Sequence, residues 1–182
     1  MNLSQLAIAA AIAAVSISAQ AQSTTTGSKG LYGEIGYTSV NYTEPGYALS
    51  PAGVVRVILG GNLMENLAID GMAGFGANDG SLTISGVTIK GHVDSFYGVY
   101  LKPKAKLSES IEVFGRIGYA NSKLTASAPG IAISASGSDV SYGVGGSVKV
   151  AKNMSLNLDY MSYYNKNGTS VNGITLGLGF NF

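Results

Sequence analysis

Residues 174–182 read Ile-Thr-Leu-Gly-Leu-Gly-Phe-Asn-Phe, and this alternating stretch decides the fold. Every second residue from Ile174 to Phe182 is large and apolar, whereas the residues between them are Thr, Gly or Asn. A period of two is typical of a β-strand with two unlike faces. Because chain termini are usually frayed and solvated, an apolar face that runs to the last residue indicates that something covers it.

The composition favours strands that face lipid. Charged residues make up 12% of the chain, about half of the share usual in soluble proteins, and glycine accounts for 26 of 182 residues, about twice its usual share. The net charge is only +1 and the basic residues are scattered, so we expect no nucleic-acid partner. The chain has no cysteine, which excludes a disulfide framework and a thiolate metal site.

The start of the chain predicts an exported protein. Residues 6–15 read LAIAAAIAAV, an apolar run too short for a membrane-spanning helix, which needs about 20 residues. Ala19-Gln20-Ala21 then fits the small-x-small rule for signal cleavage. We therefore expect a signal peptide at 1–21, a short segment at 22–29 and one domain at 30–182. An uncleaved anchor is the alternative, because residues 1–5 carry no Lys or Arg.

Alternation predicts strands along the whole domain. They are expected at residues 30–38, 53–61, 66–76, 93–107, 111–120, 140–150, 155–164 and 174–182. Short connectors at 62–65, 108–110 and 151–154 alternate with long ones at 39–52, 77–92, 121–139 and 165–173. Short turns at one rim and long loops at the other are typical of an outer-membrane barrel. We therefore predict an all-β protein, an eight-stranded antiparallel up-and-down transmembrane β-barrel, with lipid covering residues 174–182 and both termini at the periplasmic rim.

Aromatic residues on the apolar faces gather at the predicted strand ends. Tyr37, Phe75, Tyr97, Tyr119, Tyr142 and Tyr164 lie at the long-loop ends, and Phe180 and Phe182 lie at the other rim. Such aromatic girdles mark the two membrane–water interfaces.

The opposite faces carry charged residues, which we expect in the lumen. They are Glu34, Arg56, Asp70, Lys102, Lys104, Lys106, Glu112, Arg116, Lys149 and Asp159. Eight strands leave an interior just wide enough for side chains, so opposite charges should pair. We expect a plugged, salt-bridged lumen, with Glu112 as a partner of Arg116 and inward glycines making room for the Lys and Arg chains. The alternative is a narrow path for ions or small solutes.

Pro103 fits its predicted strand poorly, because proline cannot donate a ladder hydrogen bond. Either the strand has a bulge at Pro103, or it ends at Lys102 and the following turn is longer. In the second case Lys104 and Lys106 are periplasmic rather than luminal.

Residues 98–119, GVYLKPKAKLSESIEVFGRIGY, resemble a strand–turn–strand unit of the outer membrane protein A barrel. Residues 140–150 and 156–160 are similar to the wider family of small outer-membrane barrels, which includes outer membrane protein X, Ail-type adhesins and opacity-like proteins. The resemblance implies the fold and the Gram-negative cell outer membrane, and implies that Phe182 is the signal read by the barrel-assembly machinery. The resemblance does not extend to the peptidoglycan-binding domain that follows the barrel in outer membrane protein A, so we do not expect cell-wall tethering to carry over.

Catalysis finds little support in the sequence. His92 is the only histidine, and its strand parity differs from that of Ser95, so we expect an exposed loop histidine and no enzyme. An outer-membrane lipid-modifying enzyme is the less favoured alternative. No residue pattern indicates a cofactor or a metal.

Function is then expected to depend on the loops. Residues 81–90 and 131–134 alternate and could extend strands above the membrane, where a sheet edge can add a partner's strand. Plain surface loops are the alternative. Asn167-Gly168 predicts a tight turn. We expect a monomer that contacts outer-membrane lipid and lipopolysaccharide, and a surface partner through its loops.

Overall fold

The computed structural model describes residues 30–84 and 86–182. The predicted signal peptide and the segment 22–29 lie outside these residues. The described chain contains ten strands and no helix long and apolar enough to cross a membrane. The strands are β1 (Leu31–Glu44), β2 (Tyr47–Ala48), β3 (Ala52–Met64), β4 (Leu67–Asn78), β5 (Gly80–Ile84), β6 (Val87–Lys106), β7 (Ile111–Ala128), β8 (Ile131–Ala151), β9 (Met154–Lys166) and β10 (Thr169–Asn181).

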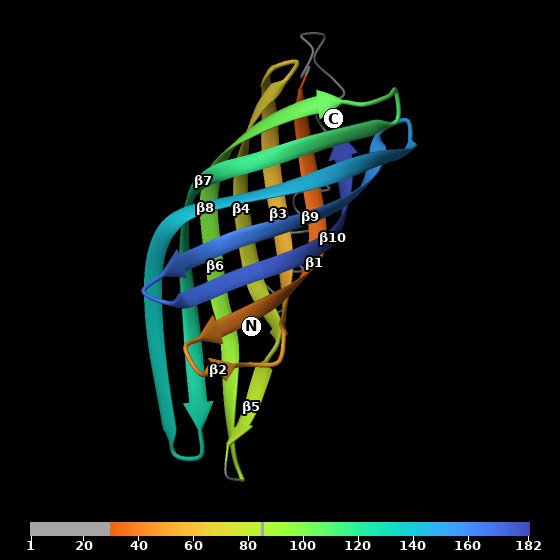
Figure 1. Ribbon diagram of the computed structural model, residues 1–182. Helices are drawn as coiled ribbons and strands as arrows, with labels where there is room; N and C mark the ends of the chain where they lie inside the picture. The colour runs from red at the N-terminus through yellow and green to blue at the C-terminus, as the bar shows by residue number, and fades with distance from the viewer. Residues whose placement is uncertain (1–29, 85) are drawn as a thin grey trace.

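Eight of these strands form a closed antiparallel barrel (Figure 1). The order is β1-β3-β4-β6-β7-β8-β9-β10, and β10 pairs back with β1 from Tyr32↔Asn181 to Thr43↔Ser170. The backbone amide of Phe182 also donates to the carbonyl of Leu31 at 3.1 Å. The predicted closure between the two terminal strands is therefore confirmed, and it removes the edge that β10 would otherwise expose.

The strands are longer than the alternation predicted, and they extend at the long-loop rim. The expected connectors 121–139 and 165–173 are wrong as loops, because most of their residues lie in strands. Only Pro129-Gly130 joins β7 to β8, and only Asn167-Gly168 joins β9 to β10. Asn167 and Gly168 have φ of 54° and 82°, which confirms the predicted tight turn.

Two hairpins protrude beyond the rest of the barrel at this rim (Figure 1). One is β5 with the start of β6, and the other is the end of β7 with the start of β8. They are joined side by side, because β6 pairs with β7 from Lys90↔Ser127 onward. We call this four-stranded extension the crown. Of the predicted strand extensions at 81–90 and 131–134, residues 81–84, 87–90 and 131–134 lie in its strands.

Pro103 neither ends the strand nor makes a bulge, so both sequence interpretations are wrong. β6 continues to Lys106, and the register with β7 is the same at Leu101↔Ile117 and Lys104↔Phe114. On the other side Pro103 lies opposite Leu67, and the amide of Lys104 donates to Asn66 at 3.0 Å. The sheet tolerates the lost donor because the neighbouring amides keep both ladders in register.

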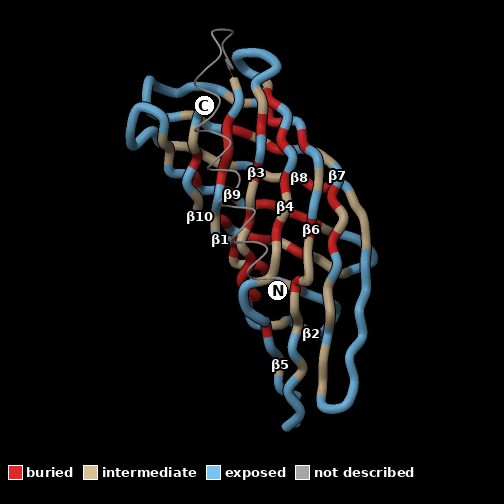
Figure 2. Tube along the Cα trace, turned by 180° about the vertical axis from the view of Figure 1, so that it is seen from behind, coloured by how far each residue is buried: buried red, intermediate tan, exposed pale blue. Residues whose placement is uncertain are grey.

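The two faces of the barrel wall are unlike (Figure 2). Outward Leu158, Val144 and Ile117 are more than half exposed, which suits lipid rather than water as their surroundings. The inward face holds two kinds of packing. One is an apolar cluster that includes Val54, Phe96 and Tyr163. The other consists of the charged inward residues, which on most strands lie closer to the short-turn rim than the residues of the apolar cluster.

Candidate functional site

Three bases and three acids are buried together inside the barrel: Arg56, Lys102, Arg116, Glu34, Asp70 and Asp159. We call them the lumen cluster. They come from β1, β3, β4, β6, β7 and β9, so the cluster joins strands from all around the barrel. The formal charges cancel, which is the condition under which charged groups can be buried at moderate cost.

Arg116 is the centre of the lumen cluster. Its guanidinium donates from Nε to Asp70 at 2.8 Å, from Nη1 to Asp159 at 2.8 Å, and from Nη2 to Glu34 at 2.8 Å. Its side chain has no exposed surface. Because arginine carries five donors in a planar fork, one side chain can serve three carboxylates at once.

The remaining bases complete the pairing. Lys102 donates to Glu34 at 2.9 Å, and Arg56 holds Asp159 through a bidentate contact whose Nη1–Oδ1 distance is 2.8 Å. In the described chain no buried side-chain nitrogen or oxygen lacks a hydrogen-bond partner. The cluster is thus fully satisfied, and this makes it rigid rather than merely tolerated.

Aromatic side chains enclose the cluster, and the sequence prediction missed them. The Tyr32 hydroxyl donates to Asp70, and Arg56 donates to the Tyr163 hydroxyl at 3.2 Å. The Phe114 ring lies 4.4 Å from Lys102 Nζ and 4.5 Å from Arg116 Cζ, within the range of cation–π contacts. Tyr32 and Phe114 share strand parity with Glu34 and Arg116, so the alternation itself contained the signal.

These rings correct the expected role of the inward glycines. A Cβ at Gly60 would collide with the Tyr32 ring, and one at Gly145 would lie 2.6 Å from the Phe114 ring. Gly74 likewise gives space to Phe96, because a Cβ there would collide with Cε1 of the ring. Gly60, Gly74 and Gly145 therefore make room for aromatic rings rather than for Lys and Arg chains, whereas Gly36 and Gly177 lie against the backbone of the neighbouring strand.

Glu112 and Lys149 were predicted in the same network, but the structure places them at the short-turn rim. Glu112 pairs with Lys104 at 3.5 Å and does not reach Arg116, so the expected Glu112–Arg116 pair is wrong. The two residues are four positions apart on β7, a distance of about 13 Å along a strand. Lys149 is exposed and, like Glu112, lines a pocket at this rim, which we call the rim pocket. Lys106 reaches Glu65 at 3.3 Å, outside the lumen.

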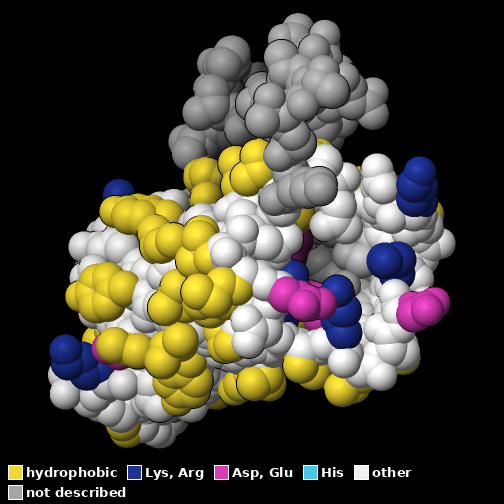
Figure 3. Space-filling model, turned by 90° about the horizontal axis from the view of Figure 1, so that it is seen from above, with side chains coloured by type: hydrophobic (Ala, Val, Ile, Leu, Met, Phe, Trp, Pro, Cys, Tyr) yellow, Lys and Arg dark blue, Asp and Glu magenta, His cyan; other side chains and the backbone are white. Residues whose placement is uncertain are grey.

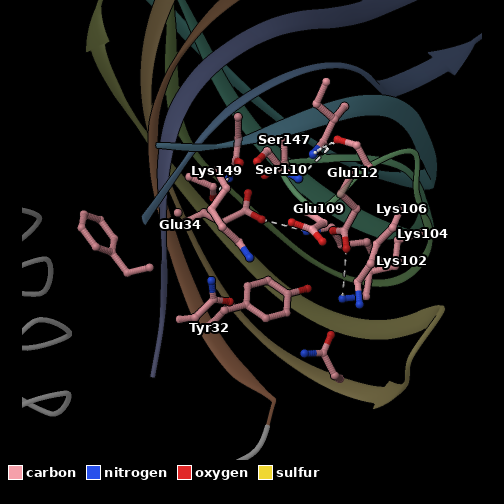
Figure 4. A pocket seen from close by; sticks show the side chains of 18 residues that line it. Tyr32, Glu34, Lys102, Lys104, Lys106, Glu109, Ser110, Glu112, Ser147 and Lys149 are labelled. Carbon is pink, nitrogen blue, oxygen red and sulfur yellow. Dashed lines mark hydrogen bonds and ion pairs between the residues drawn. The ribbon is translucent and has the colours of Figure 1, made fainter. Parts of the chain in front are cut away.

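The rim pocket has a volume of about 280 Å³, and its lining includes Glu34 and Lys102 of the lumen cluster. Figure 3 views this rim, with basic and acidic side chains around a hollow. Figure 4 shows Lys102, Lys104 and Lys106 from β6 on one side and Glu34 and Tyr32 from β1 on another. Because Glu34 and Lys102 belong to both the pocket and the cluster, the cluster forms the pocket's floor.

Tyr164 differs from the other predicted girdle residues in the face of the barrel on which it lies. Tyr37, Tyr97, Tyr119 and Tyr142 point outward and are each 50–59% exposed. Phe75 and Phe180 are half-buried, and Phe182 is 42% exposed and packs near Gly33. Tyr164 does not face lipid. A bulge between Val171 and Asn172 leaves Tyr163 as an extra residue on β9, so the parity changes and Tyr164 packs against the apolar cluster.

His92 lies in strand β6 rather than in a loop, and its ring nitrogen contacts Asp79 at 2.7 Å. Among residues 30–84 and 86–182, no group of His, Asp and Glu has the arrangement of a metal site.

A closed eight-stranded antiparallel barrel with an apolar outer face and a charged, filled interior defines the class of small outer-membrane barrels. A family model for the outer membrane protein beta-barrel domain matches residues 7–182, and the chain belongs to this family. Its place in the cell is therefore the outer membrane. No curated protein matches the chain.

Solved structures of outer-membrane proteins have the same fold. Ail, the attachment invasion locus protein of Yersinia pestis, is 20% identical with a TM-score of 0.63, covering 84% of this chain and 99% of Ail. Neisserial surface protein A is 11% identical with a TM-score of 0.66, covering 85% and 98%. OprG of Pseudomonas aeruginosa is 8% identical with a TM-score of 0.60, covering 84% and 96%. At these identities the likeness establishes the fold alone.

Proposed function

We propose that this protein is a non-conducting scaffold of the outer membrane that presents the crown to a partner at the cell surface. Two observations together carry the proposal. The lumen is filled by a fully paired charge cluster, and a sheet, the crown, protrudes from the long-loop rim (Figure 1). A filled lumen offers no continuous path for solutes. The barrel alone is enough to hold the protein in the membrane, so the protruding sheet provides a surface for another purpose.

The crown has an edge that could bind a partner's strand. From Ile131 to Ser141, β8 pairs with β7 on one side only, because β9 joins the other side from Tyr142 onward. The described residues provide no strand along this free edge. An unpaired edge presents backbone donors and acceptors that an extended segment of another protein can satisfy. Ail bears the name of an attachment protein, and we extend an attachment role to this chain as part of the proposal.

The proposal has no catalytic step. The proteins of similar fold named above are outer-membrane barrel proteins, and His92 is engaged by Asp79 rather than by a nucleophile. We also propose that the barrel is a monomer that contacts lipid and lipopolysaccharide directly, and that Phe182 engages the barrel-assembly machinery during insertion.

A narrow channel is the second candidate function, and the rim pocket favours it. The pocket lies on the short-turn side of the lumen cluster, and Lys104, Lys149 and Glu112 line it together with Glu34 and Lys102. Opening the Glu34–Lys102 pair would extend that space toward the middle of the barrel. We prefer the scaffold because this pair is backed by Arg116, which a single side-chain movement does not displace.

A shortened crown tests the proposed attachment role. Leu124 and Ala135 lie opposite each other in the ladder, so replacing residues 125–134 by Asn-Gly should close a shorter hairpin without disturbing the barrel. Bacteria of a non-adherent strain would express the wild type, this variant, or Glu65→Ala, which alters the opposite rim. We expect adhesion to cultured epithelial cells to fall well below the wild-type level for the shortened crown, which loses Ile131–Ser134 of the free edge, and to stay unchanged for Glu65→Ala.

Surface abundance and heat-modifiable gel mobility would be measured in parallel, so that a folding defect is separated from a loss of attachment. Equal adhesion by the wild type and the shortened crown, at equal abundance, would contradict the proposal. So would wild-type adhesion no greater than that of the empty vector.

A further inference from the structure

The crown reverses the polarity of the barrel wall beneath it. In the barrel the outward face is apolar, but in the crown the apolar residues point inward. Its inward positions are Leu82, Ile84, Ile89, Leu124, Ala126 and Ile133, whereas its outward positions form hydroxyl pairs such as Thr83–Thr88 at 3.1 Å and Thr125–Ser134 at 2.8 Å. This pattern suits a sheet that stands in water and covers something apolar on its inner side.

The inner side of the crown is the wall of a cavity of about 470 Å³. The opposite wall comes from the end of β1 and the segment after β2, with Val40, Tyr42 and Leu49. Leu49 is seated directly against the crown, because a Cβ at Gly91 would lie 2.5 Å from its Cδ2 atom. The volume falls in the range of small-molecule pockets, about 300–1,000 Å³.

The cavity is blind at its inner end. Val40, Ala52 and Val93 line it and belong to the buried apolar cluster, in which the rings of Phe96 and Tyr163 pack at a tilt with 4.7 Å between their centroids. Beyond that cluster lies the charged lumen cluster. A molecule in the cavity can therefore bind from outside, but it has no path through the barrel.

The lining determines the charge of the occupant. Among the described residues that line the cavity, Glu44 is the only acid and there is no base, and the Glu44 carboxylate already accepts a hydrogen bond from Tyr42. A cation would have to share this one carboxylate, and an anion would meet no opposite charge. Ile133 is 66% exposed and Ile84 39% exposed although both face inward, so apolar surface is left for an occupant to cover.

The position of the cavity determines where the occupant comes from. The cavity lies beyond Tyr37 and Tyr97 along β1 and β6, on the hairpin side of the aromatic girdle, and it faces the barrel axis. The polar outer face of the crown separates it from the surrounding lipid. An acyl chain of the outer leaflet would have to leave the membrane to enter it.

We propose that the crown cavity binds an uncharged, elongated apolar molecule, of the size of a medium-length alkyl alcohol, from the external medium. Leu82, Leu124 and Ile133 contact its chain, and Leu49 closes over it. The cavity and the free edge share the segment that contains Ile133, but the ligand would contact inward side chains whereas a partner strand would pair with the backbone of β8, so binding in the cavity does not depend on the proposed attachment role.

The absence of tryptophan from the sequence allows a clean test. Ile133→Trp places a single reporter at the cavity, and Ser134→Trp places the same reporter on the opposite face of the next residue. Both variants would be refolded into phospholipid nanodiscs, with folding checked by heat-modifiable gel mobility. They would then be titrated with ω-bromoundecanol, whose bromine quenches tryptophan at short range.

We expect saturable loss of fluorescence from Ile133→Trp that unbrominated undecanol reverses, and a much smaller, non-saturable loss from Ser134→Trp. The anionic ω-bromoundecanoate and a cationic bromoalkyl trimethylammonium should quench Ile133→Trp weakly at the same concentrations. Equal quenching of the two reporters by the alcohol would overturn the proposal, as would equal quenching of Ile133→Trp by all three compounds.

A second arm distinguishes membrane lipid from an external ligand. Nanodiscs made with phospholipid brominated along the acyl chains should leave Ile133→Trp fluorescent. Quenching by these lipids, without quenching by ω-bromoundecanol, would show that a membrane acyl chain occupies the cavity and would overturn the assignment to an external molecule. If Ile133→Trp does not fold, Ala135→Trp is the second reporter, because Ala135 also lines the cavity.

Discussion

Replacing Arg116 by methionine should destabilise the barrel by the cost of one uncompensated buried charge. Arg116 touches three acids, but two of them keep another base: Glu34 keeps Lys102 at 2.9 Å, and Asp159 keeps Arg56. Among the described residues, Asp70 keeps the Tyr32 hydroxyl alone. Removing one partner of a buried pair costs about 3–5 kcal/mol. Arg116→Met should therefore lower the free energy of unfolding by about that amount, for Asp70 alone, and not by three times as much.

The second substitution Asp70→Asn should recover most of this loss. The double variant leaves Arg56 and Lys102 with Glu34 and Asp159, so the buried charges balance again. The free energy of unfolding would be measured by urea titration of protein refolded in lipid vesicles, with the folded fraction read from gel mobility. Arg116→Met within about 1 kcal/mol of the wild type would refute the reasoning, as would independent, additive losses from the two substitutions.

Three further variants test the faces, the packing and the assembly of the barrel. Leu158→Arg should lower folding into vesicles, because a cation near the lipid midplane costs about 2–4 kcal/mol, whereas Asn157→Arg should cost less because it enters the lumen beside the rim pocket; equal losses would contradict the register of β9. Gly60→Val should lower the urea midpoint by displacing the Tyr32 ring, at a cost of about 1–3 kcal/mol, and an unchanged midpoint would contradict that packing. Deleting Phe182 should reduce the heat-modifiable protein recovered from the outer membrane in cells, and undiminished recovery would remove its proposed role in assembly.

The fold could be predicted from the sequence because lipid enforces strict alternation. Outward Ile117, Leu158 and Leu176 sit where the period of two placed them. Outside the membrane this constraint disappears. The crown strands are built largely from Ser, Ala, Thr and Gly, whose small side chains give weak contrast between faces, so the predicted strands ended too early. The bulge at Tyr163 also left no mark in the alternation, and Tyr164 was therefore placed on the wrong face.

The candidate site could be predicted in composition but not in pairing. Strand parity says that Arg116 and Glu112 both point inward, yet it says nothing of their heights in the barrel. Heights depend on the stagger between strands, which brings Glu34 of β1 and Asp70 of β4 to the level of Arg116. Parity also places Tyr32 and Phe114 on the inward face, but it does not say that their rings lie at the height of the charges.

The central claim is that the lumen is closed, and single-channel recording tests it most directly. Purified wild-type protein, refolded and inserted into a planar bilayer, should show no steady conductance and at most rare, brief bursts. The shortened crown should behave in the same way, because the lumen cluster rather than the hairpins closes the barrel. Steady, resolved conductance steps from the wild-type protein would contradict the account and would make the narrow channel the better description.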